Sequence, residues 1–267
     1  MPYARTLIDI DPAAHVATVT LNKPERLNAI GQDDAADILE ICARIQADDD
    51  VWVAIWTGAG RAFCSGADVS GGPRPSLEGA SVNQLLDEGS WIARQAAALY
   101  AVDKPMVAAV NGVAAGAGFS LALTCDVRIG SDAARFVTVF QERNLPPEGG
   151  MSWLLPRVVG LSRALDLAMT SRRVDAEEAL RIGLLDRVVA GDRLLDEARA
   201  YAAQICSIPP GAARASKRAL RRGLESSFDD ALRYESRLGS LTSRARADAK
   251  EALQSFVEKR KPRYTGR

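Results

Sequence analysis

The sequence has little histidine and cysteine: a single histidine, His15, and four cysteines among 267 residues. The cysteines, Cys42, Cys64, Cys125 and Cys206, form no CxxC pair, and one histidine cannot supply a metal-ligand cluster. We therefore expect reduced thiols, no metal site, and no Ser-His-Asp triad built on this imidazole. His15 falls in an alternating stretch that predicts a strand residue facing solvent.

Net charge and long apolar runs are also lacking. Lysine plus arginine number 34, as do aspartate plus glutamate, so no global charge favours nucleic acid or an anionic membrane. No apolar run approaches the roughly 18 residues of a membrane span. The initial MPYARTLIDI lacks the basic and apolar regions of a secretion signal. These absences predict a cytoplasmic globular protein with no membrane or nucleic-acid partner.

Apolar strands that end in glycine recur in the first 150 residues. Val51–Thr57, followed by Gly58, and Lys104–Gly112 are typical of strands buried on both faces. Helical spacing of apolar residues predicts a helix over Asp33–Gln46. Four further strands are expected at Thr6–Asp11, His15–Asn22, Val127–Gly130 and Arg135–Val139, and Phe119–Thr124 begins a buried helix. Strand–turn–helix units in this succession predict an α/β fold with crossover connections.

The last third of the sequence is predicted to be helical. Asp175 and Asp248 are the expected N-caps of two helices. The expected helices are Ser162–Thr170, Asp175–Ile182, Asp192–Ile205, Ala212–Leu224, Asp229–Leu241 and Asp248–Lys259. We assign residues 1–205 to a core and 206–267 to a helical oligomerisation region. The segment Gly71–Gly79 is rich in glycine and proline, which predicts a surface loop.

Two turns of small residues, each after an apolar strand, indicate a candidate catalytic site built from backbone N–H groups. They lie within Trp56–Asp68 and Asn111–Leu121. Such turns aim backbone N–H groups at one spot, and a helix N-terminus adds positive potential there. Two N–H groups of this kind can hold a thioester oxygen as the carbonyl becomes an enolate. Ordinary tight turns use the same residues, and neither segment contains a P-loop motif.

Five segments, in one order, resemble the crotonase (enoyl-CoA hydratase/isomerase) family. They are RAFCSGAD, KPMVAAVNGVAAGAGFSLALTCD, LPPEGGMSWLLPRVVG, DAEEALRIGLLDRVV and SFVEKRKPRYTGR. The resemblance covers most of the chain. It implies a crotonase-like spiral of ββα units with a C-terminal helical oligomerisation region, assembled as a homotrimer or a dimer of trimers. It also implies an acyl-CoA substrate, with coenzyme A as part of that substrate and no separate cofactor.

The resemblance gives roles to individual residues. It places the oxyanion N–H donors at Ala67 and Ala117. The substrate-binding residues that it implies are Arg26 near the CoA phosphates, Asp68 and Val69, which with Ala67 line the CoA-adenine path, and Phe256 and Lys259 toward a neighbouring subunit's nucleotide. Ser65 and Gly66, just before Ala67, are also expected to bind substrate. Without the resemblance, the expected role of Lys259 is only that of a solvent-exposed member of the basic run near the C-terminus.

Hydratases of this family use two glutamates to add water, and those two positions hold Ser120 and Phe140 here. A hydroxyl and an aromatic ring cannot hold and deprotonate water as two carboxylates do, so we place both residues in the acyl pocket. Glu148 matches the position at which some members, including ring-epoxide and enoyl-CoA isomerases and some hydrolases, carry a functional aspartate. Glu148 is therefore the expected base.

We expect a double-bond isomerase in which Glu148 removes an α-proton and returns it at the γ-carbon. Hydrolysis, ring opening, hydration and acyl-CoA binding without turnover are the alternatives. Glu148 also suits a helix-stabilising acid at the start of the next helix. Glu142 is a rival base, and Asp126 is expected to have a structural hydrogen-bonding role. The basic pairs Lys217-Arg218 and Arg221-Arg222 raise an RNA-binding role, against which zero net charge and few aromatics argue.

Overall fold

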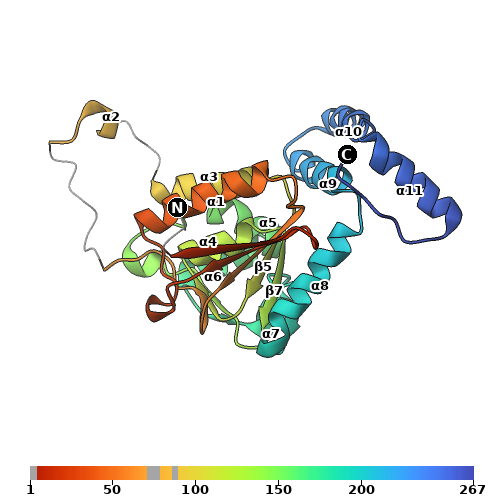
Figure 1. The fold of residues 1–267 in the computed structure, drawn as a ribbon. Coiled ribbons are helices and arrows are strands. Elements are labelled where there is room, and N and C mark those ends of the chain that lie inside the picture. The colour runs from red at the N-terminus through yellow and green to blue at the C-terminus, as the bar shows by residue number, and fades with distance from the viewer. Residues whose placement is uncertain (1–4, 71–78, 86–89) are drawn as a thin grey trace.

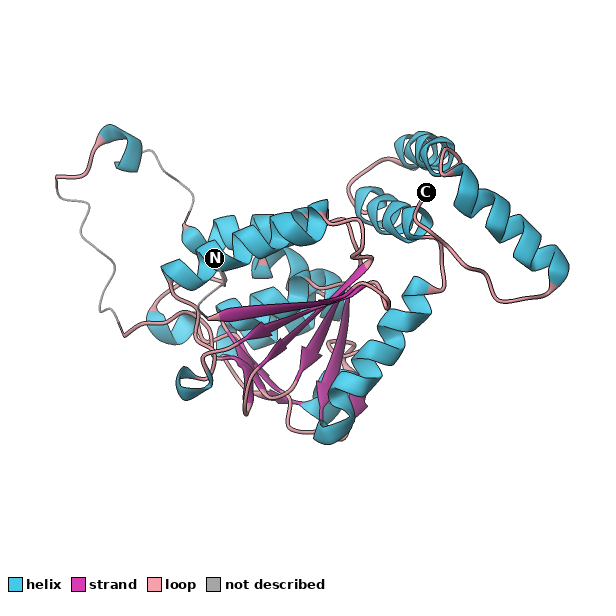
Figure 2. Ribbon diagram, in the orientation of Figure 1, coloured by secondary structure: helices cyan, strands magenta, loops and turns pink. Residues whose placement is uncertain are grey.

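The computed structural model describes residues 5–70, 79–85 and 90–267 (Figure 1). The predicted surface loop Gly71–Gly79 lies outside these residues except for its last position. The described chain forms two sheets covered by helices, as Figure 2 shows, and the predicted α/β class is confirmed.

The larger sheet has six strands in the order β1-β2-β3-β5-β7-β10. β1 is antiparallel to β2, and every other neighbouring pair is parallel. The strands are β1 (Thr6–Asp11), β2 (Val16–Leu21), β3 (Val53–Gly58), β5 (Met106–Val110), β7 (Val127–Ser131) and β10 (Arg187–Val189). Five of the six residues of β3 and all of β5 are buried, which explains why these segments are continuously apolar.

The two faces of this sheet bury different helices. Ala54 and Trp56 of β3 pack with Ile38 in the first core cluster, and Val53 and Ile55 pack with Ala198 in the second. Because side chains alternate along a strand, α1 and α3 cover one face and α8 covers the other (Figures 1 and 2).

Each predicted helix is present, whereas α2 and α3 were not predicted, and short 3-10 turns separate some of the helices. They are η1 (Pro24–Arg26), α1 (Gln32–Ala47), α2 (Val82–Leu85), α3 (Trp91–Ala101), α4 (Ala117–Thr124), η2 (Gln141–Arg143), α5 (Met151–Val159), α6 (Leu161–Thr170), α7 (Ala176–Arg181), η3 (Gly191–Arg193), α8 (Leu194–Cys206), α9 (Pro210–Gly223), α10 (Phe228–Thr242) and α11 (Arg246–Glu258). Within the described ranges, none of these helices is long and apolar enough to cross a membrane.

The smaller sheet positions the turns of interest. Its four strands run β4-β6-β8-β9, with β4, β6 and β8 parallel and β9 antiparallel. They are β4 (Ala62–Cys64), β6 (Val113–Ala115), β8 (Arg135–Val137) and β9 (Val174–Asp175). Because neighbouring parallel strands end at the same edge, the segments that follow β4, β6 and β8 meet there.

Helices α9, α10 and α11 cover neither face of the larger sheet and lie on the opposite side of the molecule from α2 (Figure 1). Asp175 caps α7 as predicted, since its carboxylate accepts from Glu178 N–H at 2.9 Å. The predicted N-cap role of Asp248 is wrong. Asp248 lies within α11 and instead accepts from the N–H groups of Thr265 (2.7 Å) and Gly266 (3.0 Å), which ties the C-terminal tail to this helix.

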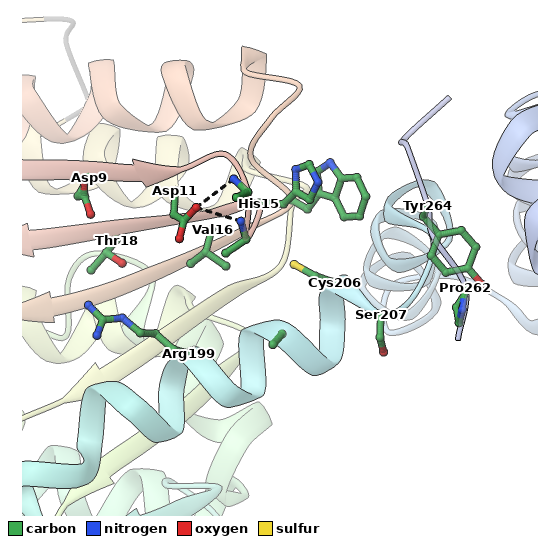
Figure 3. A pocket seen from close by; sticks show the side chains of 14 residues that line it. Asp9, Asp11, His15, Val16, Thr18, Arg199, Cys206, Ser207, Pro262 and Tyr264 are labelled. Atoms are coloured by element: carbon green, nitrogen blue, oxygen red, sulfur yellow. Dashed lines mark hydrogen bonds between the residues drawn. The ribbon is translucent and has the colours of Figure 1, made fainter. Parts of the chain in front are cut away.

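The prediction of a solvent-facing strand residue at His15 is also wrong. His15 lies in the turn before β2 with a φ of 58°, and its ring stacks on Trp52 with centroids 3.8 Å apart. Figure 3 shows His15 at a cavity of about 600 Å³ that Arg199 of α8 and Tyr264 of the C-terminal tail also line. The four cysteines are free thiols, as predicted.

Candidate active site

The N–H of Ala67 is held in place by its neighbours. Ile30 N–H donates to the carbonyl of Gly66 at 2.8 Å, and Asp68 N–H donates to the carbonyl of Ile30 at 2.8 Å. In this parallel bridge Ile30 pairs with the carbonyl of the residue before Ala67 and the N–H of the residue after it. The N–H of Ala67 itself therefore points away from Ile30. Among the described residues the N–H of Ala67 has no hydrogen-bond acceptor, as an oxyanion donor requires.

The N–H of Ala117 opens helix α4. Gly116 precedes it with a φ of 49°, and the first N–H groups of a helix have no acceptor within that helix. A Cβ built on Gly66 would lie 2.9 Å from the carbonyl oxygen of Ala115 and 3.7 Å from the nitrogen of Ala117. The two turns that the sequence predicts as donors are therefore in contact, with the positive end of α4 beside them.

Glycine at position 118 allows this approach. A Cβ on Gly118 would lie 2.4 Å from the carbonyl oxygen of Cys64 and 2.7 Å from its Sγ. Helix α4 thus packs directly against β4. Burial raises the pKa of the Cys64 thiol to about 12, so this sulfur is a neutral packing group.

The segment after β8 carries strain at the same edge. Val139 has a φ of 52°, which is rare for a β-branched residue, and such outliers gather at functional sites. A Cβ on Gly116 would lie 3.1 Å from Cγ2 of Val139 and 3.8 Å from Cε1 of Phe140. Phe140 is buried, so its ring forms an apolar wall beside the turn that holds Ala117.

Ser120 links α4 to the segment that carries the predicted base. Its hydroxyl donates to the backbone carbonyl of Glu148 at 2.8 Å. Gly149, with a φ of 65°, is pressed against α4, because a Cβ there would lie 3.0 Å from Cβ of Ser120. The Oε2 atom of Glu148 is buried. The fold therefore brings Glu148 to the helix that begins at Ala117.

The two rival acids differ from Glu148 in their surroundings. Glu142 is exposed on η2. Asp126 accepts from Met106 N–H at 2.8 Å and from Lys217 at 2.7 Å, which confirms its predicted structural role. The carbonyl of Glu148 accepts from Met151 N–H at 3.3 Å, so this residue also supports the start of α5 through its backbone.

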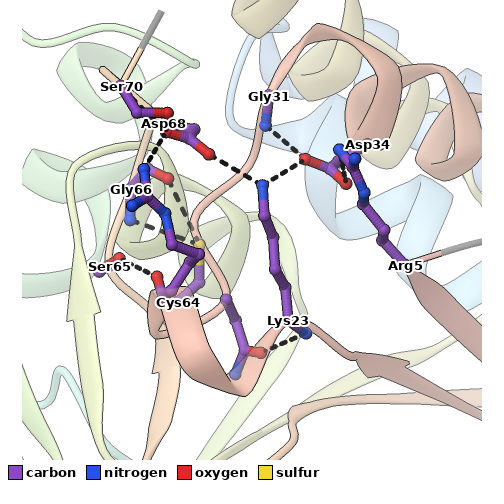
Figure 4. Close-up of polar contacts among 11 residues, drawn as sticks. Arg5, Lys23, Gly31, Asp34, Cys64, Ser65, Gly66, Asp68 and Ser70 are labelled. Carbon is purple, nitrogen blue, oxygen red and sulfur yellow. Dashed lines mark hydrogen bonds and ion pairs between the residues drawn. The ribbon is translucent and has the colours of Figure 1, made fainter.

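Asp68 is the centre of a charged cluster (Figure 4). Its carboxylate accepts from Lys23 Nζ at 2.8 Å, from Arg26 at 3.3 Å and from the hydroxyl of Ser70 at 2.6 Å. The Lys23 hydrogen bond, followed by those of Ser70, holds the pKa of Asp68 well below its usual range. Ser65 donates to the carbonyl of Arg26 at 3.3 Å, so the predicted residues Arg26, Ser65 and Asp68 lie together.

Lys23 and Asn28 were not predicted as site residues. The side-chain amide of Asn28 donates to the carbonyls of Ala59 (2.9 Å) and Ala62 (2.7 Å), and its Oδ1 accepts from Lys23 N–H at 2.9 Å. Asn28 is buried with a φ of 57°. A polar residue at the end of Lys23–Asn28 marks a turn in the sequence, but which groups it holds depends on segments 30 residues away.

Some predicted binding residues do not reach this site within one chain. Val69 is exposed next to it. Phe256 is 82% exposed on α11, and Lys259 follows that helix with a φ of 55°. Their predicted role, contact with the nucleotide of a neighbouring subunit, stays a prediction. The described residues contain no cluster of three or more histidine, cysteine, aspartate or glutamate side chains that could hold a metal ion.

Comparisons with known proteins find similarity along nearly the whole chain. The sequence model of the enoyl-CoA hydratase/isomerase family matches residues 11–267. A 1,2-epoxyphenylacetyl-CoA isomerase of Escherichia coli (strain K12) is 37% identical over 94% of this chain and 95% of its own length. A short-chain-enoyl-CoA hydratase of Clostridium acetobutylicum is also 37% identical, over 94% and 95%. The crystal structure of an enoyl-CoA hydratase from Bacillus anthracis superposes with a TM-score of 0.87 at 32% identity, covering 97% of this chain and 99% of that one.

Proposed function

The chain belongs to the enoyl-CoA hydratase/isomerase family of acyl-CoA enzymes, and from this premise we propose that it moves the double bond of an enoyl-CoA thioester from C3 to C2. One observation carries the proposal. Glu148, with its Oε2 atom buried, lies beside α4, while the two positions at which hydratases of the family carry glutamates hold Ser120 and Phe140.

The N–H groups of Ala67 and Ala117 would hold the thioester oxygen. Negative charge develops on this oxygen when C2 loses a proton, and aligned backbone donors stabilise it without reorganising. Loss of one donor of this kind typically costs about 3 kcal/mol of barrier. The two turns thus make the proton on C2 acidic enough for a carboxylate to remove.

Glu148 would then shuttle one proton. Its carboxylate takes the proton from C2, and the electron pair enters the C1–C2 bond to form the conjugated enolate. The carboxyl group returns the proton at C4 while the double bond settles between C2 and C3 and the carbonyl re-forms. Glu148 ends as it began, so a single carboxylate suffices, and the only coenzyme involved is the CoA that the substrate carries and the product keeps.

A second candidate is ring isomerisation or ring opening of an acyl-CoA. The 37% identity with the Escherichia coli 1,2-epoxyphenylacetyl-CoA isomerase favours it, and it uses the same oxyanion donors and the same acid. Several relatives are named hydratases, but Ser120 and Phe140 weigh against hydration by two glutamates.

Incubation with a 3-enoyl-CoA in deuterated water tests the proposal. Isomerisation gives 2-enoyl-CoA, with little deuterium at C4 because Glu148 returns the proton that it removed, and hydrolysis gives free CoA thiol. A parallel incubation with 2-enoyl-CoA reports hydration as a 3-hydroxyacyl-CoA. Tight binding of CoA esters without any product would instead indicate a binding protein.

The matched variants are Glu148→Gln and Glu142→Gln, which remove a carboxylate near α4 and an exposed carboxylate on η2. We expect the first to lower kcat about 10²- to 10⁴-fold and the second to leave it within about twofold. A Glu148→Gln enzyme that folds, binds CoA esters and keeps full turnover would rule the mechanism out.

A further inference from the structure

A carboxylate lies directly beside an amide that the proposed reaction uses. Asp68 follows Ala67 in the chain, and its side chain is only 14% exposed. A negative charge at that position opposes the negative charge that forms on the thioester oxygen. The site therefore requires a cation that neutralises Asp68 and is itself shielded from solvent.

Lys23 meets this requirement best. Its Nζ lies 2.8 Å from Oδ2 of Asp68, and its side chain is 15% exposed. Arg26 lies 3.3 Å from the other oxygen, but its side chain is 48% exposed. Water and salt screen an exposed pair more strongly than a sheltered one, so Lys23 contributes the larger share of the neutralisation.

Lys23 is held in place through both its backbone and its ammonium group. The backbone of Lys23 exchanges two hydrogen bonds with Asn28: its N–H donates to Oδ1 at 2.9 Å, and its carbonyl accepts from Asn28 N–H at 2.9 Å. Nζ also lies 3.7 Å from Oδ2 of Asp34, which accepts from Gly31 N–H at 2.7 Å at the start of α1 (Figure 4). Lys23 thus joins the turn before α1 to the strand segment that carries Ala67.

We propose that Lys23 is a positioning residue whose ammonium group neutralises and anchors Asp68, so that the N–H of Ala67 faces the thioester oxygen without an opposing charge. The inference rests on the proposed use of the Ala67 amide. It does not depend on which product the enzyme makes, because every thioester reaction at this site polarises the same carbonyl.

The test uses an acyl-CoA labelled with ¹³C at the thioester carbonyl. Binding to the wild-type protein should move the carbonyl resonance downfield, and Lys23→Met should lose most of this shift. In the same variant we expect kcat to fall on the order of tenfold to a hundredfold, with a smaller change in KM. Lys23→Arg should restore both quantities, and Arg181→Met, which removes an exposed cation on α7, serves as the control.

The direction of the changes in carbonyl shift and kcat distinguishes an electrostatic role of Lys23 from a purely structural one. Asp68→Asn removes the opposing charge and keeps an acceptor, so its carbonyl resonance should lie at or downfield of the wild-type position. The double variant Lys23→Met/Asp68→Asn should recover most of the kcat that Lys23→Met loses. A purely structural role predicts the opposite, a loss in Asp68→Asn and a further loss in the double variant, and that result would overturn the inference.

Three further outcomes are decisive. If Lys23→Met does not fold, the inference is tested by Asp68→Asn alone. A carbonyl resonance at or downfield of the wild-type position supports the inference, and an upfield one overturns it. If the wild type polarises the carbonyl but forms no 2-enoyl-CoA, the proposed isomerisation fails while the inference about Lys23 stands. If the wild type isomerises but Lys23→Met keeps the shift and kcat, the inference fails alone.

Discussion

Lys217 of α9 and Asp126, the residue before β7, are joined by a 2.7 Å hydrogen-bonded ion pair that ties the C-terminal helices to the larger sheet. Nζ of Lys217 also donates to the carbonyl of Lys104 at 2.8 Å, and the side chain is nearly buried. Arg218 contacts Asp103, and Arg221 lies 2.9 Å from Asp126. Three of the four basic residues that raise an RNA-binding role are thus engaged within the chain.

Removal of Lys217 is predicted to destabilise the protein strongly. Lys217→Met leaves Asp126 with less compensation in a sheltered position, and loss of one partner of a buried pair costs about 3 kcal/mol. The control is Arg233→Met, which removes an exposed pair with Asp230 and should cost less than about 1 kcal/mol. Denaturant unfolding measures both free energies, and equal losses in the two variants would contradict the prediction.

Gly118→Ala is predicted to damage both stability and turnover. The new Cβ would meet the backbone of Cys64 at 2.4 Å, so β4 and α4 must separate and the N–H groups of Ala67 and Ala117 would move apart. We expect a loss of about 2 kcal/mol in the free energy of unfolding and at least a tenfold fall in kcat.

The matched control for that change is Gly239→Ala in the last turn of α10. A Cβ on Gly239 meets nothing within 4 Å, so this variant should gain up to about 1 kcal/mol from better helix propensity. Thermal unfolding and steady-state kinetics compare the two alanines. A Gly118→Ala protein as stable and active as Gly239→Ala would show that β4 and α4 need no close contact.

Much of the fold could be predicted because its information is local. The continuous apolar runs of β3 and β5 and the helical spacing of α1 are properties of single segments. His15 and Asp248 show the limit. The stacking of His15 on Trp52 and the hold of Asp248 on the C-terminal tail depend on partners 17 or more residues away, so local patterns misplace both residues.

The residues of the candidate site likewise include some that the sequence predicts and some that only the fold reveals. The turns of Ala67 and Ala117 could be predicted from small residues after apolar strands, and Glu148 from a family resemblance. Lys23 could not, since its role arises when the fold brings it 2.8 Å from Asp68, 45 positions along the chain. Charged residues that serve a site through another residue carry no spacing pattern of their own.

The stability that Asp68 contributes should depend on pH in a defined direction. The Lys23 hydrogen bond, then those of Ser70, lower the pKa of Asp68 in the folded state from the ordinary 3.8. The contribution is therefore fully present above the unfolded pKa and is lost as the pH falls through the lowered value. The Tm difference between wild type and Asp68→Asn should be constant from about pH 7 to 5 and shrink below about pH 4. The exposed Asp192→Asn should differ little from wild type at every pH, and a difference at Asp68 that grows in acid would contradict the assigned direction.

The apolar surface of α11 predicts contact with a neighbouring subunit, within the trimer or dimer of trimers that the family resemblance implies. Leu253, Phe256 and Val257 are 68%, 82% and 70% exposed in the single chain, a cost in free energy that a partner surface would remove. We expect light scattering to give three chains, or six, per particle. Phe256→Asp should shift the protein to smaller species and raise KM for acyl-CoA at least severalfold, because the predicted nucleotide contact comes from the neighbour. Leu180→Asp, on α7, serves as the control for an exposed apolar residue outside these helices. A monomeric wild type, or a Phe256→Asp protein with unchanged mass and KM, would show that α11 serves neither assembly nor the site.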